Sequence, residues 1–556
     1  MKKILSVFAL LAFLLPVKAQ NPDHSFNVAK NLDIFNSIYR QLDLFYVDTL
    51  EADKVLREGI DAMLESLDPY TVYYPEEEMK DLKMLTTGKY GGIGSMIRMR
   101  KDSTVIIAEP YVDMPAAEVG LEVGDVLRTI DGKDLKGMSV SEVSDMLRGE
   151  PGTTFVLQVL RPGEKKMRDF RITRRNIKVP AVPFTGIVGD GKIGYICLTQ
   201  FTEECSKDVR KAVISLKEKG AQGIVLDLRN NGGGLLSEAV EIVNLFVPKG
   251  LKIVETKGKI VAANSTYTTK SEPLDLNIPL VVLVNGNTAS AAEIVSGSLQ
   301  DLDRAVIIGT KTFGKGLVQN PRELPYNGSI KLTTAKYYIP SGRCIQAIDY
   351  KKRRQEMDDA RQGKKTVQTK ADSLKNVFHT AGGREVVEGS GIKPDIEIKH
   401  DTMANVVYYL SNDDVLVDWG TKYRREHPSL RSVKEFSVTD ADYEVFKEMV
   451  KSSDFKYDRL SEKRFEDLVK IAKFEDYYDD AKAEFDALQK KLEHNVGADM
   501  DKHSKDVRKL MANEVVKRYF FQAGSVEQSL KDDEDLDKAI EIIGNSEEYK
   551  KILEVK

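Results

Sequence analysis

The side chains best suited to chemistry in this 556-residue chain lie between positions 285 and 319. Ser290 follows a run of small residues, Lys315 stands between two glycines, and Gln319 comes soon after it. A serine hydroxyl acts as a nucleophile at neutral pH only when a base takes its proton. None of the six histidines lies between positions 185 and 346, so Lys315 is the best base available. The pattern favours a hydrolase with Ser290 as nucleophile and Lys315 as general base.

The sequence around Lys315 offers a way to make it a base. A free lysine has a pKa of about 10.4, and burial in an apolar site lowers such a pKa by as much as about 3 units. Phe313, Leu317 and Val318 are apolar neighbours. On a strand, positions 315, 317 and 319 point to one face. We therefore expect Gln319 to face the amine of Lys315 and orient it.

Three consecutive glycines, Gly232 to Gly234, precede an expected helix at 235–246. Backbone N–H groups in such a loop can point at the negative charge that develops on a substrate oxygen, which makes an oxyanion hole. The N–H of Ala291, at the start of a second expected helix at 290–300, would be another donor. Two plainer interpretations remain open: a flexible loop for the glycines and a helix N-cap for Ser290.

Both candidate segments follow apolar runs, 223–228 and 280–284, that are typical of buried parallel strands. Each run leads through a loop of small residues into a helical pattern. Loops at the carboxyl ends of strands are where α/β folds place their chemistry. The sequence therefore predicts an α/β core that carries both loops.

The segment from Gly309 to Lys315 fits the spacing of a phosphate-binding P-loop but lacks its other features. Position 316 is glycine, so the hydroxyl that binds Mg²⁺ is missing. Pro321 and Pro325 interrupt any helix that would follow, and 332–339 has strand character. A nucleotide site is not expected, and no metal or cofactor is implied.

A glycine-rich turn of Gly91, Gly92, Ile93 and Gly94 opens an expected domain of short strands at 85–176. A second motif, MPAAEVGLEVGDVL, spans 114–127. The expected elements are strands at 105–109, 125–130 and 155–160, and one amphipathic helix at 139–149. The arrangement resembles a PDZ domain. That resemblance implies that the glycine turn binds the C-terminal carboxylate of a peptide, which adds a strand to the sheet edge.

Together these motifs resemble those of the carboxyl-terminal processing peptidases, also called tail-specific proteases. The resemblance runs from about 27 to 396 and includes a Ser-Gly-Arg turn within 340–346. It implies a multidomain α/β and α+β protein. The expected parts are a ClpP/crotonase-like α/β peptidase core with an inserted PDZ domain, a helical N-terminal region and a helical C-terminal extension.

The resemblance also implies a role for each matching residue. Ser290 is the nucleophile, Lys315 the general base and Gln319 its orienting partner. Gly232 or Gly233, with Ala291, supplies the oxyanion hole. The substrate tail binds at Gly91, Gly92, Ile93 and Gly94. Glu293 falls where the family has an acid near the site, without a defined role.

The first residues are typical of a secretory signal. Lys2 and Lys3 precede a short apolar run, and small residues stand before an expected cleavage after position 19. The run is shorter than the roughly 20 residues that span a bilayer, so an uncleaved anchor is the weaker alternative. We expect an exported, periplasmic protein that is soluble after cleavage. Its net charge of −4 gives no reason to expect nucleic-acid binding.

The remaining boundaries follow from composition. A helical N-terminal domain is expected at 20–84, the peptidase core at 177–400 with a charged helical insertion at about 350–376, and helices at 401–556. Those last helices are plausible surfaces for homo-oligomer assembly. The chain has only three cysteines, and so small and uneven a number does not indicate a disulfide framework.

The sequence thus predicts a serine endopeptidase that recognises the free, apolar C-terminal tails of protein or peptide substrates. One rival is a PDZ-type peptide-binding scaffold whose core is inactive or gated. The complete set of Ser290, Lys315 and Gln319 argues against a decayed core. Another rival, a crotonase-type acyl-transfer enzyme, would have no need of a tail-binding domain.

Overall fold

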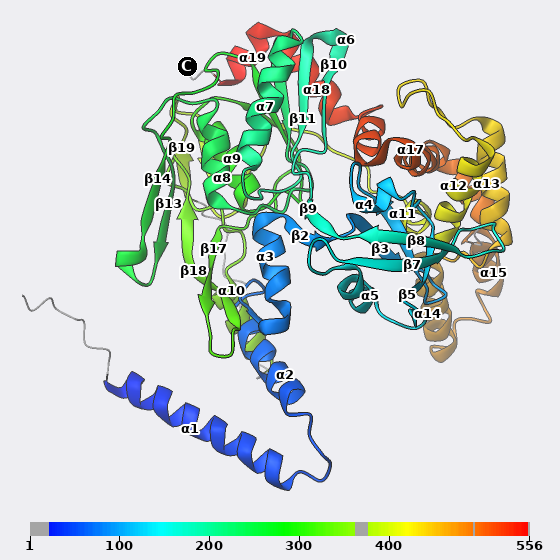
Figure 1. The fold of residues 1–556 in the computed structure, drawn as a ribbon, viewed down its shortest axis with the longest axis horizontal. Helices are drawn as coiled ribbons and strands as arrows, with labels where there is room; N and C mark the ends of the chain where they lie inside the picture. Colours follow the sequence, from blue (N-terminus) through cyan, green and yellow to red (C-terminus); the bar gives the residue numbers. More distant parts are fainter. Residues whose placement is uncertain (1–21, 362–375, 493–494, 554–556) are drawn as a thin grey trace, which may run out of the picture. The chain divides into compact units, whose positions relative to one another are not determined.

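The computed structural model describes residues 22–361, 376–492 and 495–553, and the chain divides into two compact units, 1–73 and 74–556 (Figure 1). The expected signal peptide at 1–19 lies outside the described residues. Among those that are described, no helix combines the length and the apolar character needed to cross a membrane.

The first unit contains two helices, α1 (Pro22–Phe45) and α2 (Ala52–Glu65). The hydroxyl of Tyr39 on α1 donates a hydrogen bond to the carbonyl of Ala52, 3.0 Å away, where α2 begins. Apolar side chains of α1, such as Phe35 and Ile38, are more than half exposed. The helical character expected for this region is therefore observed, without a large core of its own.

The second unit is built around a six-stranded sheet of order β10-β11-β12-β15-β16-β21. The strands are β10 (Phe184–Val188), β11 (Ile193–Cys197), β12 (Gly223–Asp227), β15 (Leu280–Val284), β16 (Val306–Gly309) and β21 (Ile396–Glu397). β10 is antiparallel to β11, and the other neighbours are parallel. Because β12 and β15 are parallel neighbours, the loops that follow them emerge at the same edge of the sheet.

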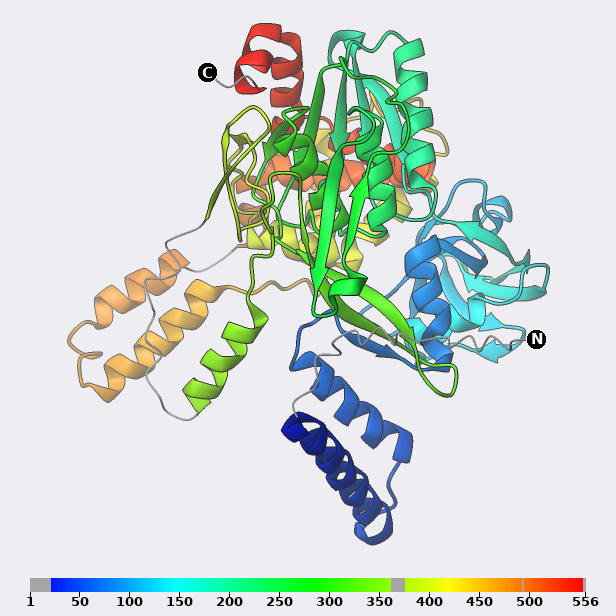
Figure 2. The same ribbon diagram turned by 90° about the vertical axis from the view of Figure 1, so that its left-hand side faces the viewer.

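Both faces of this sheet are covered, and alternate residues of β12 show how. Ile224 and Leu226 pack in the cluster that includes α7 (Cys205–Glu218), α8 (Leu236–Asn244) and α9 (Ala291–Asp301). Val225 packs on the opposite face, against α18 (Glu534–Gly544). The far C-terminal part of the chain thus completes the core, and Figure 2 shows it beside the green core strands.

A second sheet covers α9 on its other side. It is five-stranded and includes β13 (Lys252–Gly258), β14 (Ser265–Thr268), β17 (Leu317–Glu323) and β18 (Ser329–Tyr338). β13 pairs with β14 and with β18, and β18 also pairs with β17. All 11 residues of α9 are buried, as in a helix with protein on every side. The strand β17 follows Lys315, which agrees with the expected absence of a P-loop helix.

The domain of short strands has the sheet order β3-β4-β5-β7-β8. Its strands are β3 (Ser95–Met99), β4 (Val105–Pro110), β5 (Val126–Ile130), β7 (Thr154–Leu160) and β8 (Arg168–Thr173), with the short β6 (Lys133–Asp134) paired to β5. Its helices are α4 (Pro115–Glu118) and α5 (Val140–Leu147). β3 is an edge strand and contacts α5. The chain enters through β2 (Lys89–Gly92) and leaves through β9 (Arg175–Lys178), which pair with each other, so the domain is an insertion on a two-stranded ribbon.

The helices after the core form a separate cluster around Trp419 and Phe446. They are α11 (Asn405–Asn412), α12 (Asp414–Glu426), α13 (Asp440–Ser452), α16 (Val496–Lys502) and α17 (Ser504–Ser529). The helices α14 (Leu460–Phe474) and α15 (Lys482–Leu492) lie outside this cluster and pack against each other. α18 and α19 (Ser546–Leu553) then return to the core sheet. The expected insertion at 350–376 contains α10 (Tyr350–Arg361), and its remainder, 362–375, lies outside the described residues.

Candidate active site

Ser290 lies in the turn between β15 and α9. Its backbone has φ 57° and ψ −117°, a region that non-glycine residues rarely adopt and that costs on the order of 1–3 kcal/mol. Ser290 occupies the N-cap position of α9 and forms a capping box with Glu293, whose carboxylate accepts the backbone N–H of Ser290. The cap accounts for the position of Ser290 at the start of the helix, whereas the positive φ is unusual for a capping serine.

The buried carboxylate of Glu293 ties the Ser290 turn to the Lys315 loop. Its Oε2 accepts the backbone N–H of Ser290 at 2.9 Å and that of Lys315 at 2.8 Å. Its Oε1 accepts the hydroxyl of Thr312 at 2.6 Å and the N–H of Gly314 at 2.8 Å. One carboxylate thus fixes the two segments that carry the predicted nucleophile and base.

Tyr337 of β18 joins the same two segments through their carbonyl groups. Its hydroxyl lies 3.1 Å from the carbonyl oxygen of Ser290 and also donates to the carbonyl oxygen of Lys315. The ring is buried, with 2% of its surface exposed. Glu293 and Tyr337 therefore hold both the N–H and the C=O groups of the candidate residues.

The glycines beside Lys315 are required by close packing. A Cβ atom at Gly314 would lie 2.4 Å from that of Ala347, and one at Gly316 would lie 2.7 Å from the backbone nitrogen of Gln346. Gly314 also has φ 88°. The segment that contains Ala347 and Gln346 thus presses directly on the Lys315 loop and fixes its path.

The expectation that Lys315 lies on a strand with Leu317 and Gln319 is wrong. β17 begins at Leu317, and the N–H of Lys315 bonds to Glu293 instead of a strand partner. The pairing of β17 with β18 also shifts between Val318 and Gln319, where Thr334 of β18 is the extra residue. The side-chain amide of Gln319 donates to the hydroxyl of Thr333 on β18, 3.2 Å away.

The glycine loop lies against the Ser290 turn. A Cβ atom at Gly233, which has φ 100°, would come within 2.7 Å of the Cβ of Ser290 and 3.0 Å of the nitrogen of Ala291. The N–H of Gly233 is bonded to the side chain of Asn231 at 2.9 Å. Within the described chain the N–H groups of Gly232 and Ala291 have no hydrogen-bond partner, and the space beside Gly232 is open.

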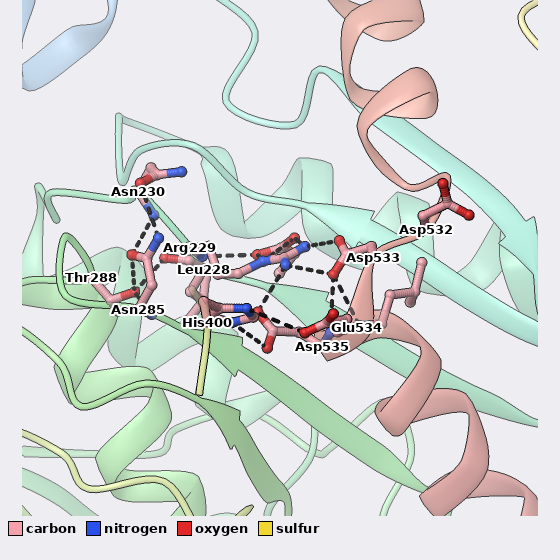
Figure 3. Close-up of polar contacts among 12 residues, drawn as sticks. Leu228, Arg229, Asn230, Asn285, Thr288, His400, Asp532, Asp533, Glu534 and Asp535 are labelled. Carbon is pink, nitrogen blue, oxygen red and sulfur yellow. Dashed lines mark hydrogen bonds and ion pairs between the residues drawn. The ribbon is translucent and has the colours of Figure 1, made fainter. Parts of the chain in front are cut away.

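Two asparagines lock the loops after β12 and β15 together (Figure 3). The backbone N–H of Asn230 donates to the side chain of Asn285 at 3.0 Å, and the Asn285 amide returns a bond of 3.0 Å to the Asn230 side chain. The hydroxyl of Thr288 donates to the carbonyl of Leu228 at 2.9 Å. The glycine loop and the Ser290 turn are therefore one hydrogen-bonded unit.

The expected carboxylate-binding turn of the inserted domain also offers N–H donors. Gly94 has φ 71°, and a Cβ there would lie 2.5 Å from that of Met114. Gly91 and Gly92 belong to β2, and the buried Ile93 anchors the turn in the core of the domain. Among the described residues, the N–H groups of Ile93 and Gly94 have no partner. They precede the unpaired edge of β3, as binding of an added strand requires.

The three cysteines are free, and none is part of this arrangement. Burial raises the pKa of the Cys197 thiol to about 12. A thiol with so high a pKa is a poor nucleophile at neutral pH. Ser290 therefore remains the candidate nucleophile.

Comparisons with known proteins agree with this division of the chain. Residues 192–352 match the family described as Peptidase family S41, residues 106–161 match a PDZ domain, and residues 406–543 match a probable PDZ-protease C-terminal helical domain. The three parts correspond to the core, the inserted domain and the helical cluster of the structure.

Curated relatives give the same result. The chain is 38% identical over 349 residues to a carboxy-terminal-processing protease of Bartonella bacilliformis, an alignment that covers 62% of this chain and 79% of the relative. It is 36% identical over 318 residues to a probable CtpA-like serine protease of Staphylococcus aureus, covering 57% of this chain and 62% of that protein. A photosystem II D1 C-terminal processing protease of known structure is 27% identical, with 66% and 92% coverage and a TM-score of 0.34.

The chain is a PDZ-containing protease of the S41 class. It belongs to the carboxy-terminal-processing protease family, as its similarity across most of the Bartonella relative shows. The fold expected from the sequence, a peptidase core with a PDZ domain and a helical C-terminal region, is confirmed.

The sequence did not reveal two features of the site. The role of Tyr337 could not be predicted, because tyrosine is common in strands and its presence there does not indicate a functional site. Arg229, just before the glycine loop, is paired with Asp533 and Asp535 from the far end of the chain. The run of acidic residues there is typical of an exposed helix start, so only the fold shows what it contacts.

The burial of Glu293 predicts an unusual pH dependence of stability. Burial raises its pKa from about 4.5 to about 7, although the bonds from Thr312, Lys315, Ser290 and Gly314 oppose the rise. A carboxyl with a raised pKa in the fold stabilises the protein at low pH, and that stabilisation is lost between the unfolded and the folded pKa.

Relative to Glu293→Gln, we therefore expect the wild type to lose roughly 3 kcal/mol between about pH 4.5 and 7 and to change little above that. Thermal unfolding of both proteins at pH 5 to 8 measures the difference. Glu241→Gln, the same change at an exposed site on α8, is the control. If the stability of the wild type relative to Glu293→Gln rises with pH instead, the four hydrogen bonds lower the pKa of Glu293 by more than burial raises it.

Proposed function

We propose that this protein is a serine endopeptidase that binds the C-terminal tails of substrates with its PDZ domain and cleaves them at Ser290. Lys315 is the general base, and the N–H groups of Gly232 and Ala291 form the oxyanion hole. Gln319 positions the lysine in the working enzyme. The substrates are proteins or peptides with free, apolar C-termini.

One observation carries the proposal. Glu293 Oε2 accepts the backbone N–H groups of both Ser290 and Lys315, so two residues far apart in sequence are held to a single atom. The bond to Ser290 is part of the capping box of α9, and the added bond to Lys315 is what joins the nucleophile segment to the base segment. Precise placement of nucleophile and base is what catalysis requires.

The geometry supports a two-step acyl transfer. The Ser290 oxygen attacks the substrate carbonyl carbon while its proton passes to the Lys315 amine. The carbonyl oxygen becomes negative and receives hydrogen bonds from Gly232 and Ala291. The peptide C–N bond then breaks, and the leaving amine takes the proton from Lys315. Water, deprotonated by Lys315, releases the acyl group and restores the serine.

The amide of Gly232 suits the oxyanion role better than that of Gly233 in this arrangement, because Gly233 N–H already bonds to Asn231. Gly232 is exposed and has open space beside it, where a substrate carbonyl would lie. Ala291 is the first residue of α9, and the N-terminus of a helix favours negative charge.

The remaining expectations are part of the same proposal. The proposal of export rests on the basic and then apolar start of the sequence. The intact mass of the mature protein tests it, because cleavage would remove residues 1–19. We also propose that the C-terminal helices form a homo-oligomer. The proposed domain limits are 20–84, 85–176, 177–400 and 401–556. The alternative function, a peptide-binding scaffold with an inactive or gated core, predicts tail binding without cleavage.

Replacing either candidate catalytic residue should abolish cleavage. An unstructured protein with an apolar C-terminus, incubated with the enzyme, should give truncated products by intact-mass spectrometry. For Ser290→Ala and Lys315→Ala we expect turnover to fall on the order of 10⁴-fold or more, with tail binding retained. Near-normal cleavage by Lys315→Ala would contradict the assigned base. Tail binding without cleavage by the wild type would favour the scaffold.

Two neighbouring glycines provide a matched test of the oxyanion loop. Gly233→Ala places a methyl group against Ser290 at a positive φ, so kcat should fall on the order of 10²–10³-fold, as when an oxyanion donor is lost. Gly232→Ala keeps its N–H and meets open space, so kcat should stay within a few-fold of the wild type. Equal effects of the two substitutions on kcat would contradict this view of the loop.

The PDZ turn can be tested on the substrate side, which leaves the enzyme unchanged. A substrate whose C-terminal carboxylate is replaced by an amide loses its charge-assisted bonds to the turn. Because tail binding is separate from the chemical step, KM should rise about tenfold or more while kcat is retained. Equal KM values for the acid and amide substrates would show that recognition does not use the free carboxylate.

A further inference from the structure

Arg229 joins the glycine loop to the far C-terminal helix α18 (Figure 3). Its guanidinium donates to Asp227, the last residue of β12, at 2.6 Å. It also forms two parallel bonds to Asp533, 2.9 Å and 2.6 Å long, and one to Asp535 of 3.0 Å. A bidentate ion pair of this kind fixes the relative geometry of the two side chains as well as contributing energy.

These charges are largely removed from water. The side chains of Arg229, Asp533 and Asp535 are 18%, 9% and 4% exposed. Removing one partner from a buried ion pair leaves the other uncompensated. The cluster therefore strongly resists any change in the position of Arg229 relative to α18.

The position of α18 is itself well fixed. Asp533 caps the helix, since its Oδ1 accepts the N–H groups of Asp535 and Leu536 at 3.1 Å and 3.2 Å. Leu536, Ala539 and Ile542 pack against the core sheet. The start of α18 thus gives the loop a further point of attachment through Arg229, in addition to its bonds to the Ser290 turn.

The attachment lies three residues before Gly232. Asn230, the next residue after Arg229, has φ 60° and bonds to Asn285. The carbonyl of Asn231 accepts the N–H of Ala289, 2.9 Å away and next to Ser290. A shift of Arg229 would therefore strain the bonds that set the Gly232 amide against the Ser290 turn.

We propose that Asp533 and Asp535 are positioning residues: through Arg229 they hold the glycine loop so that the Gly232 N–H faces the reacting carbonyl. This rests on the proposed function of Gly232 in the oxyanion hole. A C-terminal segment distant in sequence thereby takes part in transition-state stabilisation without touching the substrate. Loss of either carboxylate should lower kcat more than it changes KM.

The substitution Asp533→Asn removes the ion pair with Arg229 but keeps the helix cap. Asparagine caps helices as well as aspartate does, but its NH₂ group would meet the guanidinium of Arg229. We expect kcat to fall about tenfold, within the range that small misplacements cause, with KM within twofold of the wild type. Asp537→Asn, the same change at an exposed position on α18, is the matched control and should leave both constants unchanged.

A double-substitution cycle tests whether the effect passes through Arg229. In an Arg229→Gln background, Asp533→Asn should cause almost no further loss of kcat, because its partner is already gone. Full additivity of the two losses would overturn the proposal. A fall in kcat caused by Asp537→Asn as large as that caused by Asp533→Asn would also overturn it.

Hydrogen exchange gives a readout that does not depend on cleavage. Peptides that cover 228–234 should exchange faster in Asp533→Asn than in Asp537→Asn, while peptides of α18 remain as protected as in the wild type. Faster loop exchange in a protein that proves inactive would support the positioning role and overturn the proposed function alone. Unchanged loop exchange and unchanged kcat would overturn the positioning role alone.

Discussion

The site depends on a carboxylate that has been taken out of water. Glu293 is fully buried, and four donors from two segments surround it. A buried charge is costly unless hydrogen bonds satisfy it, so each donor must keep its place. The Ser290 turn and the Lys315 loop therefore cannot separate without leaving the Glu293 carboxylate without its hydrogen bonds. The strain at Ser290 persists because the surrounding bonds determine its conformation.

The core sheet explains why these segments meet. β12 and β15 are parallel neighbours, so the loops after them share an edge, and α9 runs back buried between two sheets. The opposite face is closed by α18 from the end of the chain. The peptidase core is therefore complete only when the C-terminal helices have returned to it. Its stability and its site geometry both depend on a segment that follows the helical cluster.

Much of this arrangement is readable from the sequence, for identifiable reasons. The apolar runs before Gly232 and Ser290 predict parallel strands correctly, and the Ser139–Glu142 capping box marks its helix. The start of β17 after Lys315 is not predictable from alternation, because the N–H of Lys315 bonds to the carboxylate of Glu293 instead of a strand partner. The partner of Arg229 is hidden as well. Asp533 is about three hundred residues away, and no local pattern encodes that contact.

The PDZ domain is held by charges at the strand that would receive a substrate tail. Arg98, at the end of β3, pairs with Asp414 at 2.8 Å, and Arg100 pairs with Asp418 at 2.7 Å. Both aspartates belong to α12 of the helical cluster. The side chains of Arg100 and Asp414 are 15% and 12% exposed, and that of Arg229 is 18% exposed, so these two side chains are about as buried as that of Arg229. The edge strand of the PDZ domain and the glycine loop are thus both tied by ion pairs to the helices that follow the core. The same C-terminal region holds the edge proposed to receive a tail and the loop proposed to stabilise the transition state, which are the two positions that the proposed mechanism must fix.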